Sequence, residues 1–171
     1  EIAHVVTRAD ARRGRGSSTT PIPVKQIAIE NSISVSHDMT WLQENSNRDL
    51  LGVVVAYGKI IPSSVLSHVP MVNIHFSLLP RWRGAAPVER AILAGDMRTG
   101  VCIMNVEETL DTGDVFARRE IDIMETHTTE NLTADLAVVG GQLLVDTLND
   151  GLGIGIPQQG ETTYATKVST D

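Results

Sequence analysis

The sequence predicts an α/β protein with a doubly wound, mostly parallel sheet. Apolar runs typical of buried strands, such as LLGVVVAY at 50–57 and GVCIMNV at 100–106, alternate with segments that suit helices. The longest of these segments, 128–150, carries leucines at the spacing of one helix face. Strands that alternate with helices favour parallel neighbours joined by helical crossovers. Such sheets place their sites at the carboxyl ends of the strands.

Composition limits the class of protein further. A chain of 171 residues with 42% hydrophobic and 20% charged residues fits one globular domain that needs no metal or disulfide to stabilise its core. No apolar run reaches the roughly 18 residues of a membrane span, and no signal-peptide pattern is recognisable, so we expect a cytoplasmic protein. The net charge of −7 is uneven, because the segment 8–15 carries four arginines and one aspartate. A basic loop on an acidic body can contact a phosphate backbone.

The elements predicted for the first part of the chain are short. A strand at 3–6 precedes a loop at 8–23 that is rich in Arg, Gly, Ser and Pro and has no hydrophobic period. A helix at 24–31 and a strand at 33–37 follow, and Thr40 is predicted to cap a second short helix.

The run 50–57 is the most continuous β-branched stretch, and it is predicted to be a central strand buried on both faces. The pair Gly140 and Gly141 interrupts the long helix at some cost in stability. The remaining predicted elements are a short helix at 61–69, a strand at 71–76, a helix at 87–94 ended by Gly95, strands at 100–106 and 114–123, and the long helix at 128–150 with Thr128 as its N-cap.

Two polar residues, Asn73 and His75, interrupt an apolar predicted strand. They are two residues apart, so both point to one face of the strand while its apolar neighbours point to the other. Asp111 follows the next apolar strand and reaches the His75 ring if the two strands are neighbours. A carboxylate favours the charged ring or one tautomer, and an amide offers an N–H to a developing negative oxygen. An imidazole, a carboxylate and an amide in this arrangement suit acyl transfer through a tetrahedral intermediate.

The same residues also have a structural interpretation, in which Asn73 and His75 are buried polar groups with satisfied hydrogen bonds and no catalytic role. Ser77 is near them, but no G-x-S-x-G elbow surrounds it, so covalent catalysis is not supported. Cys102 lies in an apolar run and is predicted to be a buried thiol. The other histidines have no metal-ligand spacing, so no metal site is predicted.

Two longer motifs resemble the signature of the folate-dependent formyltransferases. They are NIHFSLLPRWRGAAPVERAILAGD at 73–96 and TGVCIMNVEETLDTGD at 99–114, and the similarity extends from about Val5 to the YATKV sequence near the end. The resemblance implies a Rossmann-like formyltransferase fold and an enzyme that transfers a formyl group from the co-substrate 10-formyltetrahydrofolate, without a metal. It also implies a catalytic centre, formed by Asn73, His75 and Asp111.

The resemblance implies folate contacts from the stretch after the strand 50–57, from the SLLP sequence and from the turn that leads into Asp111. The residues assigned to this pocket are Val55, Ala56, Tyr57, Gly58, Ser77, Leu78, Leu79 and Pro80.

The basic loop resembles the loop ending in S-P-V-K with which the tRNA-formylating members of the family hold the acceptor end of a tRNA. The arginine of its G-R-G triplet is Arg15. The resemblance therefore favours initiator methionyl-tRNA as the acceptor, and with it a role in translation initiation. The residues assigned to tRNA contacts are Arg12, Arg13, Arg15, Arg81 and Arg83.

Other functions stay open, namely formylation of an amino-sugar or another small amine, hydrolysis of formyl-folate, and a decayed module that binds folate or RNA without catalysis. Thr109 stands where the family usually has glycine, and a β-branched residue would be strained at a positive φ. By comparison with the family pattern, we expect residues 1–171 to form a partial catalytic domain that lacks the first strand and helix of the fold. We also expect a C-terminal tRNA-binding β-barrel to be absent, and the protein to be a monomer.

Overall fold

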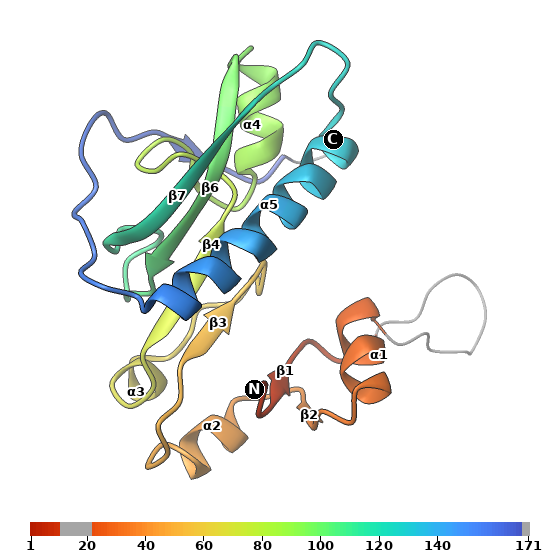
Figure 1. Ribbon diagram of the computed structural model, residues 1–171, viewed down its shortest axis with the longest axis vertical. Helices are drawn as coiled ribbons and strands as arrows, with labels where there is room; N and C mark the ends of the chain where they lie inside the picture. The colour runs from red at the N-terminus through yellow and green to blue at the C-terminus, as the bar shows by residue number, and fades with distance from the viewer. Residues whose placement is uncertain (11–21, 169–171) are drawn as a thin grey trace. The chain divides into compact units, whose positions relative to one another are not determined.

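The computed structural model describes residues 1–10 and 22–168, which belong to two compact units, Glu1–Leu50 (unit 1) and Leu51–Asp171 (unit 2) (Figure 1). Strands β1 and β2 of unit 1 pair in parallel. The strands and helices predicted for this part of the chain are confirmed, while most of the predicted loop at 8–23 lies outside the described residues. The elements of unit 1 are β1 (Val5–Val6), α1 (Pro23–Glu30), β2 (Val35–Ser36) and α2 (Thr40–Glu44).

A histidine ring is packed between elements of unit 1. The His4 ring stacks on Trp41 with 4.3 Å between the ring centroids and 7° between the planes. Its Nδ1 lies 2.7 Å from the Ser34 hydroxyl and its Nε2 lies 2.9 Å from the Ser36 hydroxyl. Burial lowers the pKa of His4. Both ring nitrogens thus contact hydroxyls in and next to β2, and the stacking on Trp41 adds the contact with α2, so His4 has a structural role.

The start of α2 differs from the prediction that Thr40 caps it. Thr40 is the first helical residue, and Met39 occupies the cap position without a side-chain hydrogen bond. The Thr40 backbone N–H instead donates to Oδ1 of Asp38, at 2.9 Å. The prediction is wrong because the carboxylate two residues earlier satisfies this free N–H group.

Unit 2 is built on a four-stranded sheet in the order β3-β4-β6-β7. Strands β3 and β4 are parallel, whereas β6 is antiparallel to both β4 and β7. A separate parallel pair joins β5 to β8. The elements of unit 2 are β3 (Gly52–Val54), α3 (Ser63–Leu66), β4 (Met71–His75), β5 (Arg83–Gly84), α4 (Pro87–Leu93), β6 (Arg98–Asn105), β7 (Val115–Asp122), α5 (Thr129–Asp150) and β8 (Tyr164–Ala165).

The predicted α/β class is confirmed. The four-stranded sheet is mixed, because β3–β4 is parallel while β4–β6 and β6–β7 are antiparallel, and this differs from the predicted mostly parallel sheet. The two-stranded pairs β1–β2 and β5–β8 are parallel. The β6–β7 pair is antiparallel because the turn at 106–114 is too short for a helical crossover, which parallel strands require.

Strand β3 does not have the predicted central position. Within the described residues it pairs only with β4, at the edge of the sheet. The side chains of Leu51, Val53 and Val55 are 37%, 42% and 52% exposed. Within unit 2 the structure therefore places this run at an edge and not at the predicted central position, because β-branched composition favours an extended chain but does not determine its neighbours.

Helix α5 lies along one face of the sheet, over β6 and β7 (Figure 1). As predicted, Thr128 caps it: its hydroxyl accepts from the Asn131 N–H at 3.4 Å, and the Asn131 side chain accepts from the Thr128 N–H at 2.8 Å. Leu132 and Leu136 on its inner face are completely buried.

Gly140 of α5 has a packing role that its low helix propensity does not indicate. A Cβ at this position would lie 3.0 Å from Cγ2 of Ile74 on β4 and 3.3 Å from Cγ1 of Val101 on β6. The glycine therefore lets the helix approach the centre of the sheet closely.

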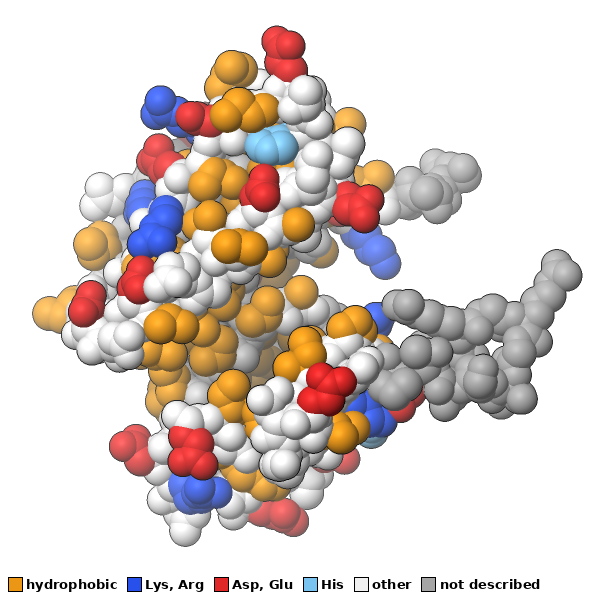
Figure 2. All heavy atoms as spheres, turned by 45° about the vertical axis from the view of Figure 1, so that its right-hand side comes forward, with side chains coloured by type: hydrophobic (Ala, Val, Ile, Leu, Met, Phe, Trp, Pro, Cys, Tyr) orange, Lys and Arg blue, Asp and Glu red, His pale blue; other side chains and the backbone are white. Residues whose placement is uncertain are grey.

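The visible face in Figure 2 carries hydrophobic side chains interspersed with charged ones. No helix of the described chain is long and apolar enough to cross a membrane.

Candidate active site

Strand β4 divides its side chains between the core and the candidate site. Val72 and Ile74 belong to the buried cluster under α5, and the alternation of the strand turns Asn73 and His75 to the opposite face. His75 is 5% exposed, whereas Asn73 is half-buried. The predicted division of the strand is confirmed.

His75 and Asp111 come together at the end of the sheet. Strand β6 pairs directly with β4, and the turn after β6 brings Asp111 to the imidazole ring. The distance from Nδ1 of His75 to Oδ2 of Asp111 is 3.7 Å, and the Asp111 side chain is 12% exposed. The same oxygen accepts a hydrogen bond from the Gly84 N–H at 2.8 Å. Both side chains are thus largely removed from water.

The other ring nitrogen of His75 has a fixed partner. Nε2 lies 2.9 Å from the carbonyl oxygen of Trp82. A carbonyl only accepts, so Nε2 carries a hydrogen and donates it. Nδ1 is then the nitrogen that faces Asp111 and that remains for chemistry.

Asp96 anchors the loop that supplies this carbonyl. Its carboxylate accepts from Nε and Nη2 of Arg81, at 2.9 and 2.6 Å, and from the Trp82 indole N–H at 2.8 Å. The Arg81 guanidinium also lies 4.4 Å from the centre of the Trp82 ring. The hydrogen bonds from Arg81 hold the pKa of Asp96 below its ordinary value, and Asp96 in turn raises the pKa of Arg81.

We expect the Asp96→Asn variant to lose stability at neutral pH but not in acid. Because the pKa of Asp96 is lowered by folding, its contribution is present above the ordinary value of 3.8 and is lost as the pH falls through the folded-state pKa. The free energy of unfolding should drop by about 1 kcal/mol near pH 7, since Arg81 is partly solvated. Urea titrations across this pH range measure the difference.

The exposed Glu125→Gln substitution is the control for that experiment, because it removes an acidic charge from the surface of the same unit. A destabilisation by Asp96→Asn that stays constant from neutral pH to below about pH 3 would contradict the assignment.

The predicted folate residues fall in two places in the structure. The stretch 55–58 directly follows β3, and positive φ angles at Ala56 (45°) and Gly58 (70°) turn the chain there. Val54 pairs in parallel with Asn73, so this turn lies at the carboxyl end of β3, beside the polar face of β4. Its position suits a ligand that reaches Asn73.

The SLLP residues are more buried. Ser77 is fully buried, and its hydroxyl donates to the Arg81 carbonyl at 2.6 Å. Leu79 and Pro80 are buried as well, and Leu78 is half-buried. These contacts shape the loop, and neither Ser77 nor Leu79 presents appreciable surface to a ligand. Leu79 packs in a cluster with Cys102, Met104 and Val115.

The predicted tRNA-binding arginines are only partly covered by the structure. Arg12, Arg13 and Arg15 lie outside the described residues. Arg81 is paired with Asp96, whereas Arg83 donates from Nε and Nη2 to the neutral Oε1 of Gln158, at 3.0 and 2.7 Å. Arg83 therefore keeps a net positive charge next to the site.

In the β6–β7 turn, the residue with a positive φ is Asp111, the catalytic candidate. Asp111 has φ 51°, while Thr109 is not among the positive-φ residues of the described chain. Thr109 is thus unstrained by its β-branch, and its carbonyl accepts from the Thr112 hydroxyl at 3.2 Å. Aspartate tolerates this backbone region better than most residues.

Three supports of the site were not predicted from the sequence: the Trp82 carbonyl, the Gly84 N–H and the Gln158 side chain. The first two are backbone groups, which carry no residue-specific signal. Gln158 lies in a loop after α5, where no period or motif distinguishes it from its neighbour Gln159.

Cys102 is a fully buried thiol, as predicted, and burial raises its pKa. In the part of the chain that the structure describes, no three His, Cys, Asp or Glu side chains are grouped to hold a metal ion.

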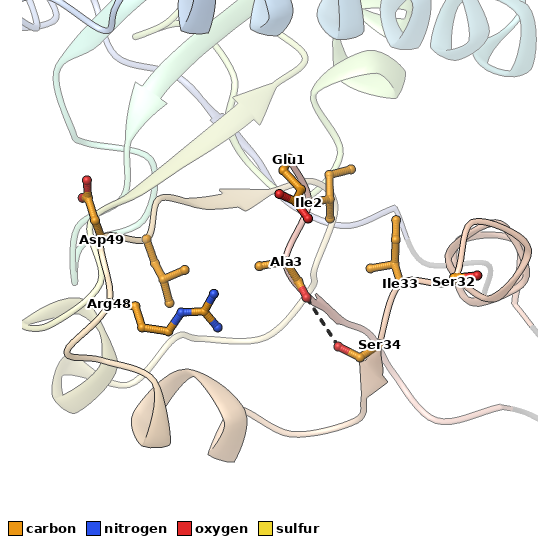
Figure 3. A pocket seen from close by; sticks show the side chains of 9 residues that line it. Glu1, Ile2, Ala3, Ser32, Ile33, Ser34, Arg48 and Asp49 are labelled. Atoms are coloured by element: carbon orange, nitrogen blue, oxygen red, sulfur yellow. Dashed lines mark hydrogen bonds between the residues drawn. The ribbon is translucent and has the colours of Figure 1, made fainter.

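A cavity of about 460 Å³ lies in unit 1 (Figure 3). It is open and polar, and none of the predicted site residues lines it, because all of those that the structure describes belong to unit 2. We therefore assign the chemistry to the β4 end of unit 2. The cavity is lined by Glu1, Ile2, Ala3, Ser32, Ile33, Ser34, Arg48, Asp49 and Leu50.

The family described as formyl transferase matches residues 1–148, so the chain belongs to the formyl transferase family. It is 47% identical to a methionyl-tRNA formyltransferase of Corynebacterium aurimucosum, in an alignment that covers 100% of the chain and 56% of that protein. It is 44% identical to a methionyl-tRNA formyltransferase of Roseobacter denitrificans, with 98% and 58% covered. The chain spans a little more than half the length of these relatives.

Solved structures share the fold. A phosphoribosylglycinamide formyltransferase from Bacillus halodurans has a TM-score of 0.73 at 26% identity, over 90% of this chain and 81% of that one. A sugar N-formyltransferase from a Shewanella species has a TM-score of 0.70 at 22% identity, over 81% and 58%. A methionyl-tRNA formyltransferase from Clostridium thermocellum has a TM-score of 0.63 at 21% identity, over 84% and 66%. The predicted formyltransferase fold is confirmed.

Proposed function

We propose that the protein transfers a formyl group from 10-formyltetrahydrofolate to the α-amino group of methionine esterified to initiator tRNA. The observation that carries this proposal is the identity of 44–47%, over nearly the whole chain, with relatives named methionyl-tRNA formyltransferase. The grouping of Asn73, His75 and Asp111 in unit 2 supports it, because acyl transfer needs groups of this kind.

In the proposed reaction the methionyl amine attacks the formyl carbon directly. The new C–N bond forms a tetrahedral intermediate. The bond from the former formyl carbon to N10 of the folate then breaks as N10 takes up the proton that the attacking amine has lost, so tetrahydrofolate leaves as a neutral secondary amine. The amide N–H of Asn73 and the Nδ1–H of a charged His75 donate to the oxyanion. Each such donor lowers the barrier by about 3 kcal/mol.

Asp111 has two functions in this scheme. Its carboxylate, 3.7 Å from Nδ1, stabilises the charged imidazole. Through water, it also accepts the proton that the attacking amine must lose. Because Nε2 of His75 is held by the Trp82 carbonyl, the ring cannot turn away from Asp111 without losing that hydrogen bond.

The proposed substrates contact different parts of the chain. Folate is assigned to the turn at 55–58, the SLLP loop and the turn that leads into Asp111, and the acceptor end of the tRNA to the basic loop. Two of the predicted tRNA-binding arginines, Arg81 and Arg83, lie in the described residues. Arg83 is the better phosphate ligand of the two, because its charge is not balanced by a carboxylate. We further propose that the protein acts as a monomer in the cytoplasm, without a metal.

A competition between acceptors tests the proposal. The full-length protein is given 10-formyltetrahydrofolate with either methionyl initiator tRNA or an amino-sugar, and the formylated product is quantified by mass spectrometry. We expect product with the charged tRNA. Product with the sugar alone, release of formate without an acceptor, or folate binding without turnover would each overturn it, in favour of a sugar formyltransferase, a hydrolase or a non-catalytic module respectively.

A further inference from the structure

The side chain of Gln158 has all its hydrogen-bonding capacity in use beside the candidate site. Its Oε1 accepts from Nε and Nη2 of Arg83, at 3.0 and 2.7 Å. Its Nε2 donates to the carbonyl oxygens of Asp111 and Gly113, at 2.9 and 2.8 Å. A primary amide has two acceptor positions and two donor hydrogens, so this half-buried side chain is saturated.

The two donated hydrogen bonds fix the turn that carries Asp111. They bind the carbonyls on both sides of Thr112, and Asp111 itself has φ 51°. A non-glycine residue stays in this backbone region when the surrounding structure holds it there. The orientation of the Asp111 carboxylate therefore depends on the backbone that Gln158 holds.

The two accepted hydrogen bonds fix the opposite wall of the site. Arg83 directly precedes Gly84, whose N–H donates to Oδ2 of Asp111 at 2.8 Å. Gln158 thus binds both segments between which this hydrogen bond forms. A carboxylate at position 158 could still accept from Arg83, but it could not donate to the two carbonyl oxygens.

We propose that Gln158 is a positioning residue for formyl transfer, which sets the direction of the Asp111 carboxylate toward Nδ1 of His75. This inference rests on the proposed function, because the carboxylate it orients is the one that acts in that reaction. Gln158 itself is not proposed to contact either substrate.

Kinetics of three variants of the full-length protein test the proposal. Gln158→Glu keeps the size and the Arg83 contact but removes both donors, and Gln158→Met removes all four hydrogen bonds. We expect Gln158→Glu to lower kcat about 30-fold, as expected for a small misplacement of a reacting group, with little change in KM for the folate. The KM for tRNA should rise, because the new carboxylate balances the charge of Arg83. The neighbouring exposed Gln159→Glu adds the same charge and should leave kcat unchanged.

A second mutation distinguishes positioning from a general structural effect. In an Asp111→Asn background the carboxylate is gone, so adding Gln158→Glu should cost less than about threefold. A full 30-fold loss in that background, or a wild-type kcat in Gln158→Glu alone, would overturn the proposal.

An NMR measurement keeps the test independent of the reaction. The backbone amide of Gly84 reports its hydrogen bond to Asp111 directly, and we expect its ¹H and ¹⁵N resonances to shift in Gln158→Glu and Gln158→Met but not in Gln159→Glu. If the wild type fails to formylate methionyl-tRNA, the proposed function is wrong while this readout still decides the role of Gln158. An unchanged Gly84 resonance in a folded Gln158→Met variant would contradict it.

Discussion

The Asp111→Asn variant is expected to lose about 10³-fold in kcat, because it removes the charge that, in the proposed mechanism, stabilises the protonated His75 ring and accepts the proton of the amine. Asparagine has nearly the same shape, and its side-chain oxygen can still accept from the Gly84 N–H. The loss should therefore occur without unfolding. Single-turnover formylation of methionyl-tRNA measures the chemical step directly.

A matched control is Asp146→Asn on α5, which removes a carboxylate that is paired with Arg119 and 42% exposed. Its turnover should equal that of the wild type. Turnover of Asp111→Asn within about threefold of the wild type would remove Asp111 from the catalytic assignment.

The Gly113→Ala variant is expected to destabilise unit 2 and to displace the Asp111 turn. A Cβ at this position would overlap the carbonyl oxygen of Asn105. The backbone there cannot easily move apart, because the Asn105 N–H donates to the Asp114 carbonyl at 2.8 Å. We expect the free energy of unfolding to fall by about 3 kcal/mol, as measured by urea denaturation.

Gly141→Ala provides the comparison, since a Cβ there meets no atom within 4 Å and the position lies inside α5. Alanine favours a helix over glycine by about 1 kcal/mol, so this variant should be as stable as the wild type or more so. Equal stability of Gly113→Ala and Gly141→Ala would contradict this prediction, because it would mean that the turn at 113 accommodates a Cβ next to the Asn105 carbonyl.

Elements with a complete local pattern could be predicted from the sequence. Helix α5 combines a capping box at Thr128 with leucines on one face, and both features are local to the segment. The edge position of β3 was not predictable, because which strands flank it is decided by contacts with distant residues. The same limit concealed the role of Gly140, whose cost within the helix is offset by close packing on Ile74.

The site was predictable to the same extent. The two-residue period of β4 placed Asn73 and His75 on one face, and the succession of two apolar strands suggested that Asp111 lies near them. The contacts that orient these groups come from further away: the Trp82 N–H donates to the hydroxyl of Thr163, 81 residues along the chain. Local periodicity carries no information about a partner at that distance.

The pairing of β5 with β8 shows that the residues supporting the site extend further along the chain than its sequence motifs do. The family match ends at residue 148 and includes Asn73, His75 and Asp111. The side chains of Gln158 and Thr163, and the Ala165 carbonyl that accepts from the Ala85 N–H at 3.0 Å, all lie beyond it. A chain cut after α5 would keep every residue of the recognisable signature and lose the hydrogen bonds that hold the two loops around it.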